Sequence, residues 1–514
     1  MASIEDQEAG LAQQPPEEMT SLELLGELRS FGGARRTEGL TDAQLEPFLS
    51  SAGLRTVIKR AWSEHQRLRG VWGEQLRCDE AVLIRALQQD YVNFYKPETI
   101  NPYVALSAQG PWIVTTHGAV LHDSGGYGML GMGHAPAAVL SAMSEPWVMA
   151  NVMTPSISHR RLGLALLDEL GHARPSDEPP FAKFLCMNSG SESVTVGARI
   201  ADVNALRMTK PGGRHADRTP YFLGLEGAFH GRTDRPAQVS DSSMPTYRKH
   251  LASYQERQNL LTVPPNDLDA LRSVFRYADK NNIFIEAMFI EPVMGEGRPG
   301  WAMSRAFYDL ARELTAAHGS LLLIDSIQAG LRATGCLSIV DYPGFEDCVP
   351  PDMETYSKAL NAGQYPLSVL ALNERAADLY VKGIYGNTMT TNPRALEVAC
   401  AVLSSITPEL RRNIRDRGEE LVDKLRALAT ELPGTITLVE GTGLLLCAEL
   451  DPRFPVIGFD GVETWCRRHG LGVIHGGQNA LRFTPHFAIT TPEIDLLISL
   501  VRDALRAFIT TSEQ

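Results

Sequence analysis

Cysteine is scarce in this chain and is not arranged for cross-linking. The 514 residues include only seven cysteines, at positions 78, 186, 336, 348, 400, 447 and 466. No two of them form a C-x-x-C pair, and the number is odd. A disulfide framework and a cysteine-based zinc ribbon are therefore not expected, and reduced thiols in a cytoplasmic protein fit the pattern best.

Excess positive charge and long apolar runs are also missing. The formal net charge is −13, with 48 Lys and Arg against 61 Asp and Glu, which argues against nucleic acid or an anionic membrane as the main partner. No uninterrupted apolar stretch of about 18 residues is present, so no membrane span is expected. The first 20 residues are acidic and polar, unlike a secretory leader. Small molecules are thus the expected partners.

The common signatures of metal and serine hydrolases are absent as well. The 13 histidines show no H-E-x-x-H or comparable ligand spacing, and no G-x-S-x-G elbow occurs. We therefore predict neither a metal site nor a catalytic triad.

The order of patterns along the chain predicts an α/β protein in four parts. Residues 1–20 are rich in Glu, Gln and Pro and predict a disordered tail. Helical periodicity predicts a helical extension over 21–110, and alternating strands and helices predict a large α/β domain over 111–391. Residues 392–514 return to helices with one short sheet and predict a smaller α/β domain.

The centre of the large domain contains a strand, a helix and another strand in succession. Residues 283–293 and 320–325 are strand-like, and 304–319 are helical, so the unit predicts parallel strands covered by helices on both faces. Ligands gather beyond the carboxyl ends of such strands. Asp325 lies at one of these ends, directly after an apolar run where a carboxylate is costly to keep charged, and Lys358 follows the next strand.

A third element predicts an anion site near these two residues. The segment 186–208 reads as a strand, a Ser-Gly-Ser turn and a helix beginning near Ser191. Free backbone N–H groups at a helix start, with Gly190 permitting close approach, form a natural phosphate cradle. A phosphate site, an acid and a lysine beyond one sheet suggest pyridoxal 5′-phosphate (PLP) held as a Schiff base. Its protonated ring nitrogen would then neutralise Asp325.

Residues from about 110 to 510 resemble the class III aminotransferases of fold type I, the group of the ornithine, acetylornithine, 4-aminobutyrate and ω-amino acid transaminases. Nine stretches occur in the family's order: GMGHAP (131–136), NSGSES (188–193), AFHGRT (228–233), EPVMGEG (291–297), DSIQAG (325–330), YSKAL (356–360), GNTMTTNP (386–393), GTGLLL (441–446) and RFTP (482–485). The resemblance implies a PLP-dependent enzyme that transfers an amino group from an amino acid or amine to a keto acid or aldehyde.

The resemblance also implies roles for individual residues. Lys358 is expected to form the Schiff base and to move the substrate proton, and Asp325 to pair with the pyridine nitrogen. The other residues expected at the cofactor are Gln328 at its phenolic oxygen, Ile327 and Phe229 on the two ring faces, Gly190 and Ser191 at the phosphate, and His230 beside Phe229. Thr388 matches a threonine that reaches the phosphate of the partner subunit, which implies a homodimer with a shared active site.

Two further positions concern the substrate. Arg482 matches the arginine that binds an α-carboxylate through two hydrogen bonds. Glu296 matches a glutamate that masks this arginine in some family members, which lets one pocket accept first an ω-amine and then an α-keto acid. A structural salt bridge is the alternative interpretation of this pair.

The chain departs from the family pattern close to the cofactor. Ser326 stands where the family has a glutamate, and Arg332 and Ala333 replace a glycine–arginine pair. Thr390 and Thr391 replace two glycines.

These changes leave other PLP chemistry open, namely racemisation or epimerisation, β- or γ-elimination or replacement, and carbon–carbon bond formation. A non-catalytic binding relative is a further alternative. The sequence does not identify the substrate. Nor does it decide whether the extension covers the active-site entrance, widens a dimer interface or binds a partner.

Overall fold

The computed structural model describes residues 14–16, 18–149, 152–255 and 259–512. Most of the predicted tail, residues 1–20, therefore lies outside the described residues. None of the seven cysteines is disulfide-bonded. Within the described ranges, no helix combines the length and the apolar character needed to cross a bilayer.

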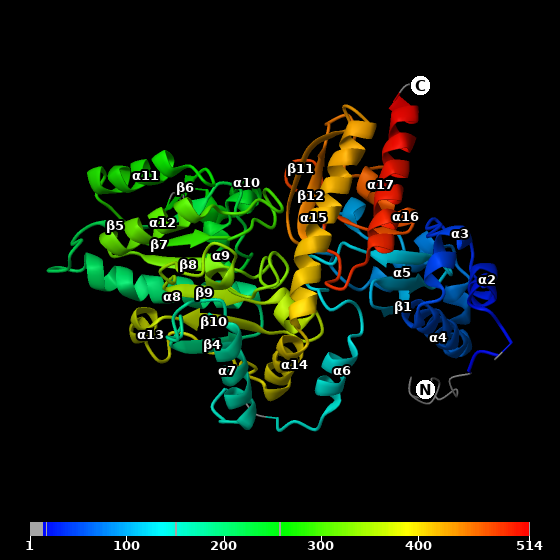
Figure 1. The fold of residues 1–514 in the computed structure, drawn as a ribbon, viewed down its shortest axis with the longest axis horizontal. Coiled ribbons are helices and arrows are strands. Elements are labelled where there is room, and N and C mark those ends of the chain that lie inside the picture. Colours follow the sequence, from blue (N-terminus) through cyan, green and yellow to red (C-terminus); the bar gives the residue numbers. More distant parts are fainter. Residues whose placement is uncertain (1–13, 17, 150–151, 256–258, 513–514) are drawn as a thin grey trace.

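The N-terminal part consists of helices that pack on a small sheet, shown in blue in Figure 1. Its helices are α2 Ser21–Phe31, α3 Asp42–Leu45, η1 Glu46–Phe48, α4 Ala52–Leu76, α5 Glu80–Gln88 and η2 Pro97–Thr99. The sheet has the order β1-β2-β3-β13, from β1 Ala105–Gln109, β2 Trp112–Thr115, β3 Val120–Asp123 and β13 Leu471–Gly472. Because β1 pairs with β2, one sheet spans the boundary predicted at residue 110. We propose to group β1 with the residues that follow it.

The large domain is built on a seven-stranded sheet of order β4-β10-β9-β8-β7-β5-β6. Its strands are β4 Lys183–Met187, β5 Thr219–Leu225, β6 Leu260–Val263, β7 Ile283–Ile290, β8 Leu321–Asp325, β9 Met353–Tyr356 and β10 Ser368–Leu372. The pairs β5–β6, β5–β7, β7–β8 and β8–β9 are parallel, and only β10 runs antiparallel to its neighbours. The mostly parallel sheet predicted from the sequence is confirmed.

Helices cover both faces of this sheet, as Figure 1 shows. The helices of the domain are α6 Ala137–Ser144, α7 Ile157–Glu169, α8 Gly190–Thr209, α9 Asp234–Val239, α10 Met244–His250, α11 Leu268–Lys280, α12 Arg305–His318 and α13 Glu374–Leu379, with the short turns η3 Asp241–Ser243, η4 Ala252–Tyr254, η5 Ile339–Asp341 and η6 Lys358–Asn361. Alternate residues of β8 enter different cores: Leu321 and Leu323 pack with α8, whereas Leu322 and Ile324 pack with α11 and α12. This alternation directs Asp325 toward the α8 side.

The C-terminal part is a second α/β unit, shown in yellow to red in Figure 1. It contains α14 Pro393–Ser404, α15 Pro408–Glu431, β11 Ile436–Thr442, β12 Leu445–Leu450, α16 Val462–Arg468, β14 Ile474–Gly476, β15 Ala480–Phe483 and α17 Thr491–Ser512. Four of its strands form an antiparallel sheet of order β11-β12-β15-β14. Its core is continuous with that of the N-terminal helices, because Leu25, Ile58, Leu446 and Val501 belong to one cluster of buried side chains.

Candidate active site

Asp325 ends the buried strand β8 and has two partners inside the protein. Its Oδ1 accepts a hydrogen bond from the backbone N–H of Ile327 at 3.1 Å, and its Oδ2 lies 2.7 Å from Nδ1 of His230. Both side chains are almost completely buried. Burial opposes the charge on His230, but the hydrogen bond and the negative charge of Asp325 raise its pKa above the ordinary value. His230 thus holds a proton against the carboxyl group of Asp325 and fixes its orientation.

Lys358 follows β9, whose residues pair with β8 so that Asp325 lies opposite Thr355. Its backbone has φ of 44°, in the left-handed region that a side chain with a Cβ rarely adopts. Such strain is characteristic of functional positions. Burial lowers the pKa of the Lys358 amine, while the charges of Glu296 and Asp325 act in the opposite direction. A lysine that is neutral more often is a better nucleophile and base.

The side chain of Gln328 indicates whether the site fits a cofactor. Its side chain is 5% exposed, and its Nε2 has no hydrogen-bond partner among the described residues. A buried amide donor without an acceptor is destabilising, and an oxygen atom of a bound ligand would satisfy this group. Gly295 makes room for it, because a Cβ at that position would lie 1.8 Å from Oε1 of Gln328. The residues present fit the phenolic oxygen of PLP.

The predicted phosphate cradle is the start of α8. Ser189 caps the helix and exchanges hydrogen bonds with Glu192 in a capping box. Gly190 is the first helical residue, and a Cβ there would lie 2.6 Å from Cδ1 of Ile327. The cradle is therefore in contact with the residue expected on the cofactor ring. Ser191 Oγ lies 2.7 Å from Oγ1 of Thr233, which ties the helix start to the AFHGRT segment.

Phe229 is held through its backbone. Its N–H donates to Oε1 of Glu291 at 2.9 Å, and the N–H of Gly295 donates to Oε2 at 2.9 Å. Burial raises the pKa of Glu291 to about 7. This carboxyl connects the Phe229 loop to the Gly295 loop.

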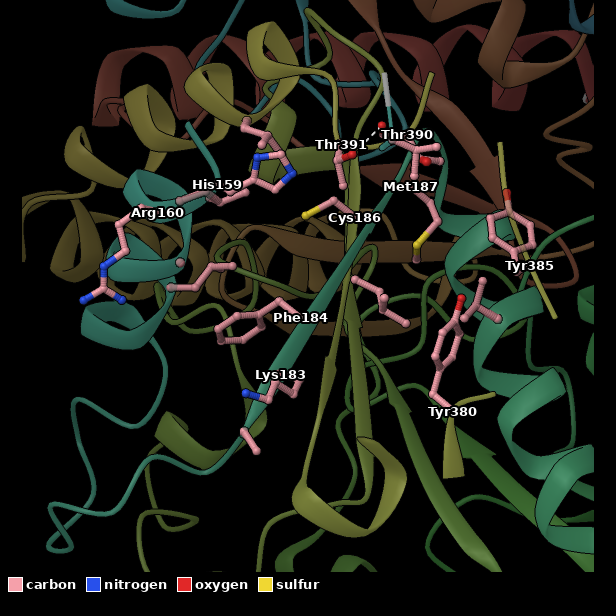
Figure 2. Close-up of a pocket in the computed structure, with 18 of the residues that line it drawn as sticks. His159, Arg160, Lys183, Phe184, Cys186, Met187, Tyr380, Tyr385, Thr390 and Thr391 are labelled. Atoms are coloured by element: carbon pink, nitrogen blue, oxygen red, sulfur yellow. Dashed lines mark hydrogen bonds between the residues drawn. The ribbon is translucent and has the colours of Figure 1, made fainter. Parts of the chain in front are cut away.

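Thr388 lies on the exposed loop between α13 and α14. The loop is attached to the cradle through Glu192, whose Oε1 accepts hydrogen bonds from Tyr385 Oη at 2.6 Å and Asn387 Nδ2 at 3.0 Å. A cavity of about 400 Å³ opens beside it, lined by residues of α7, β4 and the loop. Figure 2 shows Met187, Tyr385, Thr390 and Thr391 on one side of this cavity and His159 and Arg160 on the other.

The Arg482–Glu296 pair predicted from the sequence is present. Arg482 on β15 is completely buried, and its Nη1 lies 3.0 Å from Oε1 of Glu296. The same nitrogen donates to the carbonyl oxygen of Gly295. Burial works against the charge on Glu296, but Arg482 and Lys358 hold its pKa below the ordinary value. The pair thus lies within the electrostatic reach of Lys358.

The N-terminal extension reaches this pair. The ring of Tyr95 stacks on that of Tyr127 with 6.5 Å between centroids, and the guanidinium of Arg482 lies 5.3 Å from the Tyr127 ring. A second cavity of about 430 Å³ lies between residues 93–103 and the Gly125–Met129 segment. The extension therefore contacts Tyr127, the residue that packs on Arg482.

Ser326, the first departure from the family pattern, is compensated by a residue that the sequence analysis missed. Its Oγ donates at 2.5 Å to Oε1 of Glu354 on β9, and Ser338 Oγ donates at 2.5 Å to Oε2. Glu354 is completely buried. An acidic side chain from the neighbouring strand therefore lies at position 326, where this chain has a serine.

Of the other departures, Arg332 and Thr390 form hydrogen bonds to the backbone, whereas Thr391 adopts a left-handed conformation. Arg332 is fully buried and donates to the carbonyl oxygens of Pro485 at 2.6 Å and Leu444 at 3.1 Å, which joins the DSIQAG turn to the small domain. Burial lowers its pKa to about 9. Thr391 has φ of 60°, which explains why a glycine suits this position, and Thr390 Oγ1 donates to Asn387 O at 2.7 Å. Both sets of changes leave the cradle and Gln328 in place.

Comparison with known proteins is consistent with this geometry. Residues 94–505 match the family model of class-III aminotransferases. The chain is 31% identical to the acetylornithine aminotransferase of Thermosynechococcus vestitus over 325 residues, covering 63% of this chain and 74% of the relative. It is 29% identical to the acetylornithine aminotransferase of Xanthomonas campestris pv. campestris over 434 residues, which cover 82% of this chain and 97% of the relative.

Solved structures show the same fold at lower identity. The ornithine aminotransferase of Toxoplasma gondii, a structure described as having PLP at partial occupancy, superposes with a TM-score of 0.71 at 22% identity, covering 85% of this chain and 96% of its own. The acetylornithine aminotransferase of Elizabethkingia anophelis superposes with a TM-score of 0.66 at 22% identity, covering 83% and 99%.

Proposed function

This chain belongs to the class-III aminotransferase family and is a PLP-dependent transaminase, and we propose that Lys358, Asp325 and Gln328 form the centre of its active site. The observation that carries this assignment is the orphaned Nε2 of Gln328, and the left-handed backbone of Lys358 supports it. The family membership favours transamination over the racemase, lyase and carbon–carbon bond-forming alternatives.

When bound, PLP supplies a ring that accepts the electron pair released as a proton leaves the substrate carbon next to nitrogen. Asp325 would hold a proton on the ring nitrogen, and His230 orients the Asp325 side chain through its 2.7 Å contact. Lys358 would hold the cofactor through its side-chain amine. The same amine, whose pKa is lowered by burial, would move the proton on the substrate.

Gly190 and Ser191 bind the phosphate through backbone N–H groups at the start of α8, where the helix dipole favours an anion. Ile327 and Phe229 would pack on the two faces of the ring. The position of Ile327 against the helix start supports its part in this proposal, since a Cβ at Gly190 would lie 2.6 Å from Cδ1 of Ile327.

We further propose a donor with a terminal amine, of the ornithine type, and an α-keto acid as acceptor. The support is the Arg482–Glu296 pair at 3.0 Å. While Glu296 neutralises Arg482, the pocket accepts a substrate end without a carboxylate. An arriving α-carboxylate displaces Glu296 and takes the two parallel hydrogen bonds of the guanidinium.

The test is a panel of amino donors with 2-oxoglutarate as acceptor, in which nitrogen-15 from the donor is followed into glutamate. Transfer from a terminal amine by the wild-type enzyme, and none by Lys358→Ala, is expected. Glutamate without nitrogen-15 from any donor would contradict the substrate proposal. If Lys358→Ala kept near-normal turnover, the site assignment would be wrong.

We propose in addition that the enzyme is a homodimer in which Thr388 of one subunit contacts the phosphate bound by the other. Thr388 is exposed in the single chain, and its loop also contains Thr390 and Thr391, which line the cavity of Figure 2. Large apolar side chains are exposed along the neighbouring segment and on α7, namely Val148, Met149, Val152, Ile157, Leu164 and Leu167. An exposed apolar surface of this kind is typical of a protein interface.

Mixed dimers of Lys358→Ala and Thr388→Ala subunits test the shared site. If Thr388 acts across the interface, one site of the mixed dimer has both native residues and binds PLP with wild-type affinity. If Thr388 acts within its own chain, each site carries one substitution and no wild-type affinity returns. Light scattering of the purified protein gives the dimer mass independently.

A further inference from the structure

Two histidines and a glutamate from three separate elements meet outside the active site. His122 lies on β3, His486 follows β15, and Glu493 lies in the first turn of α17. One ligand atom of each residue lies within 4.8 Å of the other two. His122 and Glu493 are buried, with 1% and 7% exposure, and the side chain of His486 is 12% exposed. The cluster is thus nearly closed to water.

The distances in this cluster do not fit hydrogen bonds. Glu493 Oε1 lies 3.6 Å from Nε2 of His122 and 3.4 Å from Nε2 of His486. Neither nitrogen has a hydrogen-bond partner among the described residues. Hydrogen bonds between N–H and oxygen are about 2.7–3.2 Å long. Two ligands about 2.0–2.1 Å from one tetrahedral ion, in contrast, are about 3.4 Å apart.

Neighbouring groups orient the two buried residues so that one atom of each faces the centre. His122 Nδ1 lies 3.2 Å from Oγ of Ser124. When the Nδ1–H of His122 donates to this hydroxyl oxygen, the lone pair of the neutral imidazole is on Nε2. Glu493 Oε2 accepts two hydrogen bonds of 2.7 Å, from the N–H and the hydroxyl of Thr490, which leaves Oε1 unoccupied. Outer contacts of this kind are what hold the ligands of protein metal sites.

We propose that His122, His486 and Glu493 bind a Zn²⁺ ion. Two imidazole nitrogens and one carboxylate oxygen suit zinc, and the fourth position is left for water or another small ligand. The ion connects β3 to the segment that follows Arg482 and to the start of α17. The backbone already joins two of these segments, since Thr484 N–H donates to Ser124 O at 2.7 Å. The role of the ion is structural, because it stabilises the contact between the N-terminal sheet and the C-terminal helix.

The experiment compares zinc content and thermal stability of the full-length, PLP-loaded protein and three variants. His486→Gln and Glu493→Gln each remove one ligand, and Gln at 493 still offers an oxygen to the Thr490 cap. His250→Gln is the matched control, because His250 is an exposed residue at the end of α10. Each protein is equilibrated with Zn²⁺, dialysed, and measured by mass spectrometry of the metal, with far-UV circular dichroism as the check on folding.

The expected result is close to one zinc per chain in wild type and His250→Gln and less than a tenth of that in the two ligand variants. Added Zn²⁺ should raise the melting temperature of the first two proteins only. Co²⁺ should give the visible absorbance of a tetrahedral site only in these two. Equal zinc content in wild type and in a folded His486→Gln variant would overturn the proposal, and the cluster would then be an ion pair of a protonated histidine with Glu493.

Discussion

Glu354 gives the sharpest physical test of how this chain compensates for the serine at position 326. The carboxyl is completely buried between β8 and β9. Its Oε1 accepts hydrogen bonds from Ser326 Oγ at 2.5 Å and from the N–H of Ile339 at 3.0 Å, and its Oε2 accepts one from Ser338 Oγ at 2.5 Å. Burial raises the pKa of Glu354 from the ordinary 4.5 to about 7, although these hydrogen bonds act in the opposite direction.

The sign of the effect on stability follows from this pKa. Below pH 4.5 the carboxyl is protonated in both the folded and the unfolded chain, so it contributes no pH dependence. Between pH 4.5 and 7 it ionises in the unfolded chain but keeps its proton in the folded one, so folding becomes less favourable as the pH rises. Each pH unit in this range lowers the free energy of unfolding by about 1.4 kcal/mol, so the loss of stability reaches about 3 kcal/mol above pH 7.

The perturbation is Glu354→Gln, which keeps the shape but cannot ionise. The amide NH₂ must face one of the groups that donates to Glu354, which costs roughly 1 kcal/mol at every pH. The variant should therefore be less stable than wild type at pH 5 and more stable at pH 8. An unfolding entropy of about 2.1 cal/mol/K per residue converts the 3 kcal/mol difference to roughly 3 °C in melting temperature for a chain of this length.

Calorimetry of the PLP-loaded proteins from pH 5 to pH 8 measures this crossing. Glu419→Gln is the control, because Glu419 is an exposed glutamate on α15. Its difference from wild type should not vary with pH. If the difference between Glu354→Gln and wild type were also constant across this range, Glu354 would not be the buried carboxyl described here.

Three further outcomes are expected. Asp325→Asn should fold and still bind PLP but lose turnover on the order of 10²-fold or more, since a neutral side chain cannot hold the proton on the ring nitrogen; near-normal kcat in steady-state kinetics would contradict this. Glu296→Gln should lower the KM for the α-keto acid several-fold, because Arg482 loses the charge that competes with the substrate carboxylate, and an unchanged KM would leave their 3.0 Å contact purely structural. Thr391→Gly should leave the melting temperature unchanged or raise it, because relief of the left-handed backbone offsets the added freedom of the unfolded chain. Thr390→Gly should lower the melting temperature. Equal losses of melting temperature in the two variants would refute the strain argument.

Much of the candidate site was predictable because it depends on local sequence. Asp325 and Lys358 were placed at one sheet edge by the rule that parallel strands end on the same side, and β8 and β9 do lie side by side. The predicted helix start near Ser191 lies at Gly190. Residues whose partners are distant in sequence were not found. Glu354 lies in a short strand with no distinctive pattern, and only strand pairing brings it to Ser326.

The sequence by itself determined the family, the cofactor and the order of the elements, because motif residues, apolar periodicity and turn signals act over a few neighbouring positions. The tertiary structure decided which charges and polar atoms meet. The Arg482–Glu296 contact was expected only through the resemblance, and the meeting of His122 with His486 and Glu493 had no signal at all in the sequence. Such contacts depend on how separate elements pack, and packing geometry is a property of the folded chain as a whole.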